Sequence, residues 1–234
     1  MSQELPLGAE VDWTPVQRPA RTPLRGEHVL LRPVDAVADA EALYAVSHAP
    51  DGDPAIWTYL PYGPYKDPDH MRQLLEWAQS SDDPLFFVLV GVTDERPAGL
   101  ASYLRITPES GVIEIGHIWF GVPLQRTTAA TEAIYLLARH AFNDLGYRRL
   151  EWKCNALNVA SRRAAQRFGF CFEGVFRNHM VVKGRNRDTA WYAITDAEWP
   201  LIRLGFEAWL APENFGQDSQ QKRSLSGLMG DARR

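Results

Sequence analysis

Cysteine and long apolar runs are both scarce in this sequence. Only Cys154 and Cys171 occur among the 234 residues, in neighbouring predicted strands, and no arrangement of Cys and His has the spacing of a metal site. Residues 1–23 carry proline and glycine without the apolar centre of a signal peptide, and no run is long enough to cross a bilayer. We therefore expect a reduced, cytoplasmic compartment, no metal centre and no membrane association.

Internal repeats and two common nucleotide-binding signatures are missing as well. Neither GxGxxG nor GxxxxGK[ST] follows a predicted strand, which disfavours dinucleotide-binding and P-loop chemistry. The net charge of -4 argues against direct binding of nucleic acid. This average hides one basic segment, residues 148–187, with ten Lys or Arg against two acids. Its charge of +8 would suit a phosphate-bearing ligand, an RNA surface or solubility alone.

Apolar and aromatic residues, in contrast, are plentiful. The chain is 45% hydrophobic and contains eight tryptophans, enough for one sizeable core, whereas two independent domains would be crowded. We expect one domain over residues 25–211, an extended arm over residues 1–24 and a polar, mobile tail over residues 212–234.

The apolar periodicity predicts a mixed α+β fold, because strand-like and helix-like segments alternate. Short turns join three successive strands in the middle of the chain into an antiparallel meander, and strand–helix–strand units follow it. In chain order, the expected elements are strand 27–33, helix 35–47 capped by Asp35, an aromatic surface loop 51–64, helix 67–80, strands 85–92, 98–106 and 112–122, helix 128–145, strand 148–155, helix 158–168, strands 172–182 and 189–195, and helix 196–210.

One junction carries the first chemical signal. In residues 114–133 a strand runs into a helix across Gly121 and Pro123, which directs the first backbone N–H groups of the helix, at residues 126–130, outward. These groups and the helix dipole attract an anion, and Arg126 adds positive charge. The Thr127 and Thr128 hydroxyls add further donors, and Ala129 and Ala130 leave space for a ligand. An ordinary strand–loop–helix junction with a Thr N-cap is the alternative interpretation.

A second stretch, residues 155–174, pairs a helix start with arginines. Asn158 and Ser161 lie in the first turn of the predicted helix, and a Gly-Phe pair ends it. Alone, this pattern is a capped amphipathic helix whose three arginines, Arg162, Arg163 and Arg167, form a solvated face.

Together the two stretches resemble the GNAT superfamily of acyl-CoA N-acyltransferases, within it the RimJ/RimL-like branch that acetylates protein N-termini. The resemblance covers roughly residues 27–195. Residues 125–133, QRTTAATEA, are similar to the pyrophosphate-binding signature of the family. Asn158, Ser161, Gly169-Phe170 and Glu173-Gly174 match its second signature in the expected order.

This resemblance implies a GNAT-like fold: a central, twisted, mostly antiparallel sheet of about seven strands, helices on both faces, and two central strands that splay apart. Acetyl-CoA would be the cosubstrate, with its pantetheine between the splayed strands. The implied cofactor contacts are the main chain near Trp119, Phe120 and Val122, the phosphate loop Gln125, Arg126, Thr127, Thr128, Ala129 and Ala130, and the residues Asn158 and Ser161 on the far side. Arg126 and Thr128 replace glycines of the family, which puts the affinity for CoA in question.

Acetyl transfer to an amine requires a base for the amine and a proton for the departing thiolate. Glu114, in the strand before the distortion, is the favoured base. His117 is expected on the opposite face of that strand unless a bulge intervenes. His179 is a further candidate base, and Ser161 resembles a residue that relays a proton to the thiolate in RimL-like relatives.

The acceptor is less constrained. Aromatic residues of the loop and residues 185–188 are expected to flank its groove, with Trp57 belonging to the core. A peptide N-terminus would fit, and Asp51, Asp53 and Asp67 would attract a cationic one, but equally a polyamine. The alternatives are a small-molecule acetyltransferase acting on an amino acid, polyamine or aminoglycoside, and a noncatalytic acyl-CoA-binding or RNA-associated domain. The oligomeric state stays open, with a homodimer as one option.

Overall fold

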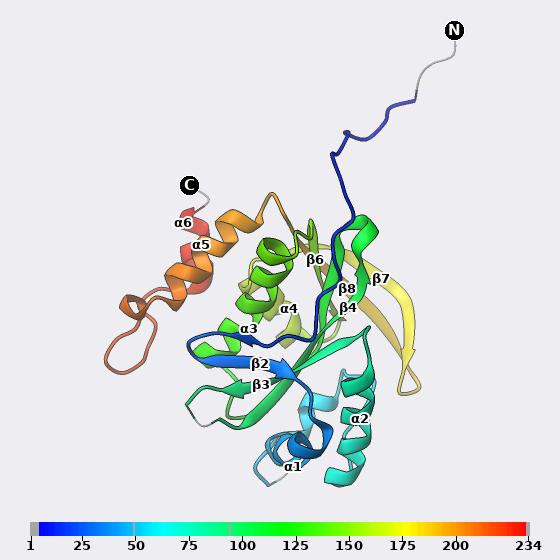
Figure 1. The fold of residues 1–234 in the computed structure, drawn as a ribbon, viewed down its shortest axis with the longest axis vertical. Helices are drawn as coiled ribbons and strands as arrows, with labels where there is room; N and C mark the ends of the chain where they lie inside the picture. The colour runs from blue at the N-terminus through cyan, green and yellow to red at the C-terminus, as the bar shows by residue number, and fades with distance from the viewer. Residues whose placement is uncertain (1–4, 49, 94, 233–234) are drawn as a thin grey trace.

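The computed structural model describes residues 5–48, 50–93 and 95–232, and it is built on one eight-stranded sheet (Figure 1). The strand order is β1-β2-β3-β4-β5-β6-β8-β7. The strands are β1 Leu24–Arg25, β2 Val29–Pro33, β3 Leu85–Gly91, β4 Pro97–Thr107, β5 Val112–Phe120, β6 Arg149–Asn155, β7 Cys171–Val182 and β8 Arg185–Thr195.

The sheet is mixed, as the sequence predicted. Strands β2 to β5 form an antiparallel meander, β5 and β6 are parallel, and β8 lies antiparallel between β6 and β7. The parallel pair needs a crossover, which the chain between β5 and β6 provides as a helix. The strand β1, which pairs with β2, was not expected, because its two residues are too few to show a periodicity.

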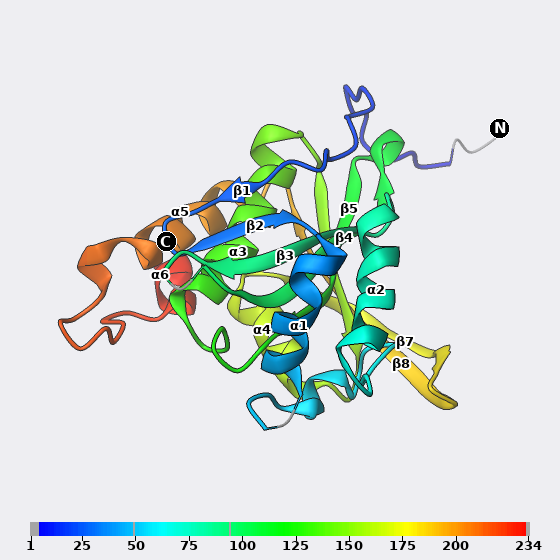
Figure 2. The same cartoon turned by 60° about the horizontal axis from the view of Figure 1, so that its bottom comes forward.

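Helices cover the sheet on both faces (Figure 2). The α-helices are α1 Ala36–Ser47, α2 Pro68–Ser80, α3 Thr128–Arg139, α4 Val159–Arg167, α5 Trp199–Leu210 and α6 Leu225–Ala232; short 3-10 turns lie at Pro54–Trp57, Pro108–Ser110 and Pro212–Asn214. The predicted N-cap Asp35 is confirmed, since its carboxylate accepts the N–H groups of Val37 and Ala38. The predicted helix over 128–145 instead changes to a π-helical turn at His140–Asp144.

Strand β3 separates two apolar cores, which accounts for its unbroken apolar sequence. Leu85, Phe87 and Leu89 face the core formed with α3, α4 and α5. Phe86 and Val88 face the smaller core under α1 and α2. Trp77 of α2 lies at the margin of this smaller core: 44% of it is exposed, and its ring packs edge-on against Phe86.

The N-terminal arm is extended, and its side chains bind the rest of the protein at several points. Trp13 donates its indole N–H to the carbonyl of Glu109 at 2.7 Å. Further along, Arg18 donates to the carbonyl of Ile106, and Arg21 pairs with Asp82. Within the described residues, no helix combines the length and apolar character that a membrane span requires.

The C-terminal segment departs from the expected mobile tail. Helix α6 packs on α5, with Leu225 fully buried and Met229 only 5% exposed. A Cβ at Gly205 would come within 2.5 Å of Met229, so the glycine permits the two helices to approach closely. The composition of residues 212–234 is polar on average. This average concealed the apolar stripe that Leu225 and Met229 form on one side of α6.

Leu225→Ala should therefore lower the free energy of unfolding by about 2 kcal/mol or more, because it empties a filled core position. The matched control is Ser226→Ala, at an exposed position of the same helix. Urea unfolding followed by tryptophan fluorescence measures both. Equal stability of the two variants would restore the picture of an unpacked tail.

Candidate active site

Strands β5 and β6 part from each other halfway along their length. Their parallel register runs only from Val112↔Arg149 to Ile115↔Trp152, whereas the strands continue to Phe120 and Asn155. The register between β4 and β5 shifts at this level, and His117 adopts a φ of 50°. This left-handed residue forms a bulge that turns β5 away from β6. The predicted splay between the two central strands is thereby confirmed.

The N-terminus of α3 presents backbone donors shortly after this strand ends. Thr127 is the N-cap, and its hydroxyl accepts the N–H of Ala130 at 3.2 Å, so that donor is already occupied. Within the described part of the chain, no hydrogen-bond partner accepts from the backbone N–H groups of residues 126–129. Because the helix dipole adds partial positive charge there, this end of α3 suits a negatively charged ligand.

The backbone conformation of the loop before α3 explains why glycine would be favoured there. Arg126 has a φ of 61°, a left-handed conformation that costs a non-glycine residue about 1–2 kcal/mol. Thr128 is the first residue of α3 and carries no such strain. Gln125 donates its side-chain amide to the carbonyl of Phe120 at 2.9 Å, which ties the loop to the end of β5. Gln125 and Phe120 therefore bind each other in this structure.

A buried ionic cluster lies on the face of β5 and β6 opposite the main core. The Lys153 ammonium is 2.9 Å from Glu114 Oε2 and 2.5 Å from Glu151 Oε2. Arg105 Nε lies 3.2 Å from the same oxygen of Glu114. The Lys153 side chain is only 4% exposed, and its ammonium stands 3.8 Å above the ring centre of Trp191.

Our interpretation of the sequence missed Lys153 and Trp191. The available signal was the alternation of Arg149, Glu151 and Lys153, which places three charges on one face of a strand whose other face is apolar. Burial raises the pKa of Glu114, and this effect outweighs the lowering by Lys153 and Arg105. Glu114 is therefore a carboxylate whose proton affinity is higher than that of an exposed glutamate.

His117 lies on the same face as Glu114, contrary to the simple alternation of a strand. The left-handed bulge moves its ring against that of Tyr62, with centroids 5.5 Å apart and planes 4° from parallel. The Tyr62 hydroxyl is 3.1 Å from Nδ1 of His117. Burial, followed by the positive charge of Arg187, lowers the pKa of His117 to about 4, so the ring is neutral at physiological pH.

His179 and Arg187 meet at the hydroxyl of Thr189. His179 Nδ1 lies 2.9 Å from Thr189 Oγ1, and Arg187 donates from Nε to the same oxygen at 3.2 Å. Burial lowers the pKa of His179, with further lowering by the nearby charges of Arg105 and Arg187. A Nδ1 atom already in contact with a hydroxyl is less available as a base than a free imidazole nitrogen would be.

Helix α4 supplies the opposite wall of the splay. Asn158 is confirmed as its N-cap, because its side-chain oxygen accepts the N–H of Ser161 at 3.0 Å. The hydroxyl of Ser161 accepts the indole N–H of Trp152 at 3.0 Å. The same hydroxyl can donate its hydrogen, and the Cys154 sulfur is one acceptor within its reach.

The aromatic loop and the β7–β8 hairpin meet at one end of this face. Trp57 is fully buried, as predicted, and its carbonyl accepts from the Lys183 ammonium at 2.8 Å. Tyr59 donates to the carbonyl of Leu157 at 3.3 Å. Two of the acids expected to attract a cationic acceptor instead cap helices: Asp53 accepts the N–H of Ala55, and Asp67 accepts the N–H of His70.

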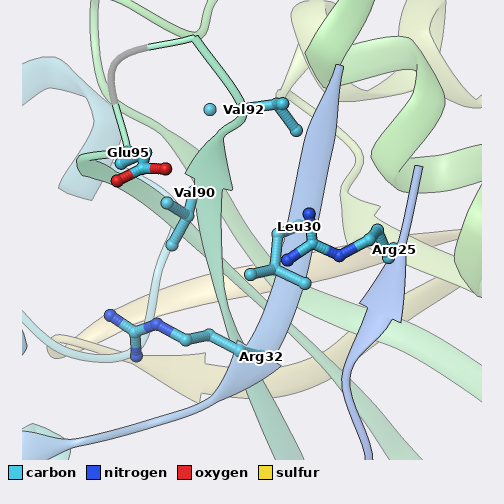
Figure 3. Close-up of a pocket in the computed structure, with 7 residues that line it drawn as sticks. Arg25, Leu30, Arg32, Val90, Val92 and Glu95 are labelled. Carbon is cyan, nitrogen blue, oxygen red and sulfur yellow. The ribbon is translucent and has the colours of Figure 1, made fainter. Parts of the chain in front are cut away.

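Two surface hollows accompany these elements. One is lined by Arg149, Glu173, Gly174, Phe176 and Trp191, next to the ionic cluster. The other lies at the opposite edge of the sheet, on β1, β2 and β3, as Figure 3 shows; Arg25, Leu30, Arg32, Val90, Val92 and Glu95 surround it. The latter contains none of the expected site residues, and its Arg32 is already paired with Asp39.

Among the described residues, no group of three or more His, Cys, Asp or Glu side chains is arranged to hold a metal ion.

Comparison with known proteins places this geometry in a family. The acetyltransferase (GNAT) domain family matches residues 28–171. A crystal structure of a GCN5-related N-acetyltransferase from Brucella melitensis is 44% identical, with a TM-score of 0.90 over 94% of this chain and 99% of that one. A probable acetyltransferase (GNAT family) from Chromobacterium violaceum is 40% identical, with a TM-score of 0.74 over 86% and 98% of the two chains.

A curated relative adds a name from the branch that the motifs resemble. The protein named "Putative ribosomal N-acetyltransferase YdaF" from Bacillus subtilis is 24% identical over 175 residues, which cover 74% of this chain and 94% of the relative. The family match, the 44% identity over nearly the whole length and the splayed sheet agree. The chain belongs to the GNAT family and is an acetyltransferase.

Proposed function

We propose that this acetyltransferase transfers the acetyl group of acetyl-CoA to the amino group at the N-terminus of a protein or peptide. The observation that carries the acetyl-CoA part of this proposal is the set of backbone N–H groups at residues 126–129 without partners in the described chain, at the end of a strand that has separated from its neighbour. The name of the Bacillus subtilis relative, a ribosomal N-acetyltransferase, supports a protein acceptor. A cytoplasmic location stays a prediction from the sequence.

The residues present fit a CoA diphosphate. Four available donors at a helix N-terminus, with Arg126 beside them, match a doubly charged phosphate group. Thr127, Thr128, Ala129 and Ala130 would line this seat, while Gln125 keeps the loop against Phe120. The main chain near Trp119, Phe120 and Val122, beyond the last register pair of β5 with β6, would hydrogen-bond the pantetheine amides, with Asn158 on the α4 side.

The reaction joins the acceptor nitrogen to the acetyl carbon as the carbon–sulfur bond breaks, and acetyl-CoA supplies the activated thioester. The chain must remove one proton from the amine and deliver one to the sulfur. Glu114 is the proposed base, because burial raises its pKa and it lies on the face where the acceptor would approach. His179 is the second candidate, weakened by the contact of its Nδ1 with Thr189.

Ser161 is the proposed donor to the sulfur. Its oxygen accepts from the Trp152 indole, and its hydroxyl also contacts the Cys154 thiol, so it would have to turn from that sulfur toward the thiolate of the cofactor. A serine hydroxyl is too weak an acid to be the ultimate source, so it would act as a relay. The same role would bring Ser161 into contact with the bound cofactor.

The other proposals from the sequence fare differently. Membership of an acetyltransferase family disfavours a noncatalytic or RNA-associated domain. Two arginines of the basic segment also make contacts within the protein: Arg149 pairs with Glu151 and Glu173, and the Arg167 guanidinium lies over the ring of Trp209. A small-molecule acceptor shares every proposed cofactor residue and is the alternative. The Lys183 ammonium joins the β7–β8 hairpin to the Trp57 carbonyl at one end of the proposed acceptor face.

The test combines binding and turnover. Isothermal titration should show saturable acetyl-CoA binding, and thiol release should be faster with a panel of peptides bearing free N-termini than with amino acids, polyamines or aminoglycosides. N-terminally blocked versions of the same peptides are the control and should be inactive. Turnover confined to the small amines would replace the proposed acceptor, and absence of binding at millimolar acetyl-CoA would contradict the cofactor site.

Glu114→Gln should leave the affinity for acetyl-CoA unchanged and reduce kcat at neutral pH by about 10²–10⁴-fold, because the base is lost. In the wild type, kcat/KM should rise with pH as Glu114 loses its proton, at a pH above the ordinary carboxyl range because its pKa is raised. The variant should lack this rise. Glu173→Gln, at a more exposed carboxylate of the same network, is the control and should keep it. An unchanged profile in Glu114→Gln would remove Glu114 as the base.

A further inference from the structure

Arg187 lies on the same face of the sheet as the ionic cluster, and within the described residues it has no anionic partner. Arg105 and Lys153 pair with Glu114, and Arg149 pairs with Glu173. Among the described residues, no carboxylate lies within ion-pair distance of the Arg187 guanidinium, and its one hydrogen bond runs from Nε to the Thr189 hydroxyl. The cluster thus contains one positive charge in excess.

The position of Arg187 places this charge beside the splay. Pairing between β6 and β8 ends at Asn155↔Thr189, and Arg187 follows on the same face of β8. After burial, its positive charge is the next cause of the lowered pKa of His117 at the bulge of β5; burial lowers the pKa of Arg187 itself, and the negative charge of Glu114 acts against that lowering. The guanidinium therefore lies near both the bulge and the proposed base.

The guanidinium is also held in a fixed orientation. Thr189, 1% exposed, contacts both Arg187 Nε and His179 Nδ1, so the hydroxyl anchors the two side chains together. With Nε anchored, the two terminal NH₂ groups have no hydrogen-bond partner among the residues that the structure describes. A half-buried guanidinium keeps its charge, and its planar pair of donors fits a carboxylate in bidentate geometry.

The anion that would pair with Arg187 is better explained as part of the acceptor than as part of the cofactor. The proposed diphosphate seat is the N-terminus of α3, a helix that packs against the main core. Arg187, in contrast, shares the opposite face of the sheet with Lys153 and Trp191, where helices α1 and α2 cover only the meander strands. A ligand that reaches the splay from this face would pass the free NH₂ groups of Arg187.

We infer that the acceptor carries a carboxylate near its amino group and that Arg187 binds this carboxylate, which makes Arg187 a specificity-determining residue. This inference rests on the proposed function and narrows it to N-termini followed by an acidic side chain. The carboxylate of a free amino acid offers the same chemistry, and the experiment below separates the two sources.

The experiment uses two matched pairs of acceptors: a Ser-Glu and a Ser-Gln peptide that are otherwise identical, and alanine with alanine amide. Thiol release gives kcat and KM, and calorimetry on the CoA-saturated protein gives affinity without turnover. The variants are Arg187→Gln and Arg187→Lys, with Arg177→Gln as the control at an exposed arginine of the same hairpin.

The wild type should prefer the Ser-Glu peptide by about tenfold to a hundredfold in KM and affinity. Arg187→Gln should abolish the preference by weakening binding of that peptide alone, with kcat little changed; Arg187→Lys should retain part of it and Arg177→Gln all of it. A preference confined to alanine over its amide would support the role of Arg187 but refute the peptide acceptor. Equal binding within both pairs, no binding of any acceptor, or an equal loss for both members in Arg187→Gln would overturn the inference.

Discussion

Strands β5 and β6 share only four register pairs before the bulge at His117 turns β5 aside. Backbone groups in a sheet interior normally bond to the next strand, so this interruption leaves edges that a ligand can pair with. The same departure carries the chain to the loop at Arg126 and to the start of α3, where further N–H groups have no partner in the described residues. One local distortion therefore opens the site and positions its anion-binding end.

The ionic cluster is the second constraint, because it is buried against the sheet. Lys153 lies between Glu114 and Glu151 and against the Trp191 ring, so these three buried charges each have an opposite charge nearby. Removing one partner from such a cluster leaves an uncompensated charge, which costs more than a surface pair contributes. Glu114 thus serves both the stability of the sheet and, in our proposal, the chemistry of the site.

The sequence was sufficient for the order of the elements, the caps Asp35 and Asn158 and the helix at the phosphate loop, since these depend on local periodicity and on residues a few positions apart. Features that depend on distant parts of the chain were not accessible in this way. The pairing of Lys153 with Glu114 requires the strand order, and the packing of α6 requires the space above Gly205. The side chain of His117 was assigned to the wrong face because a left-handed bulge at a non-glycine residue has no clear sequence signal.

The central claim is that the free amides of residues 126–129 receive the diphosphate of CoA. Amide chemical shifts and hydrogen exchange, measured by NMR during titration with CoA, report on these four groups directly. The account predicts large shift changes and slowed exchange at residues 126–129, and none at the exposed N–H groups of the β7–β8 hairpin tip. Saturable binding of CoA that leaves these four amides unchanged would contradict it.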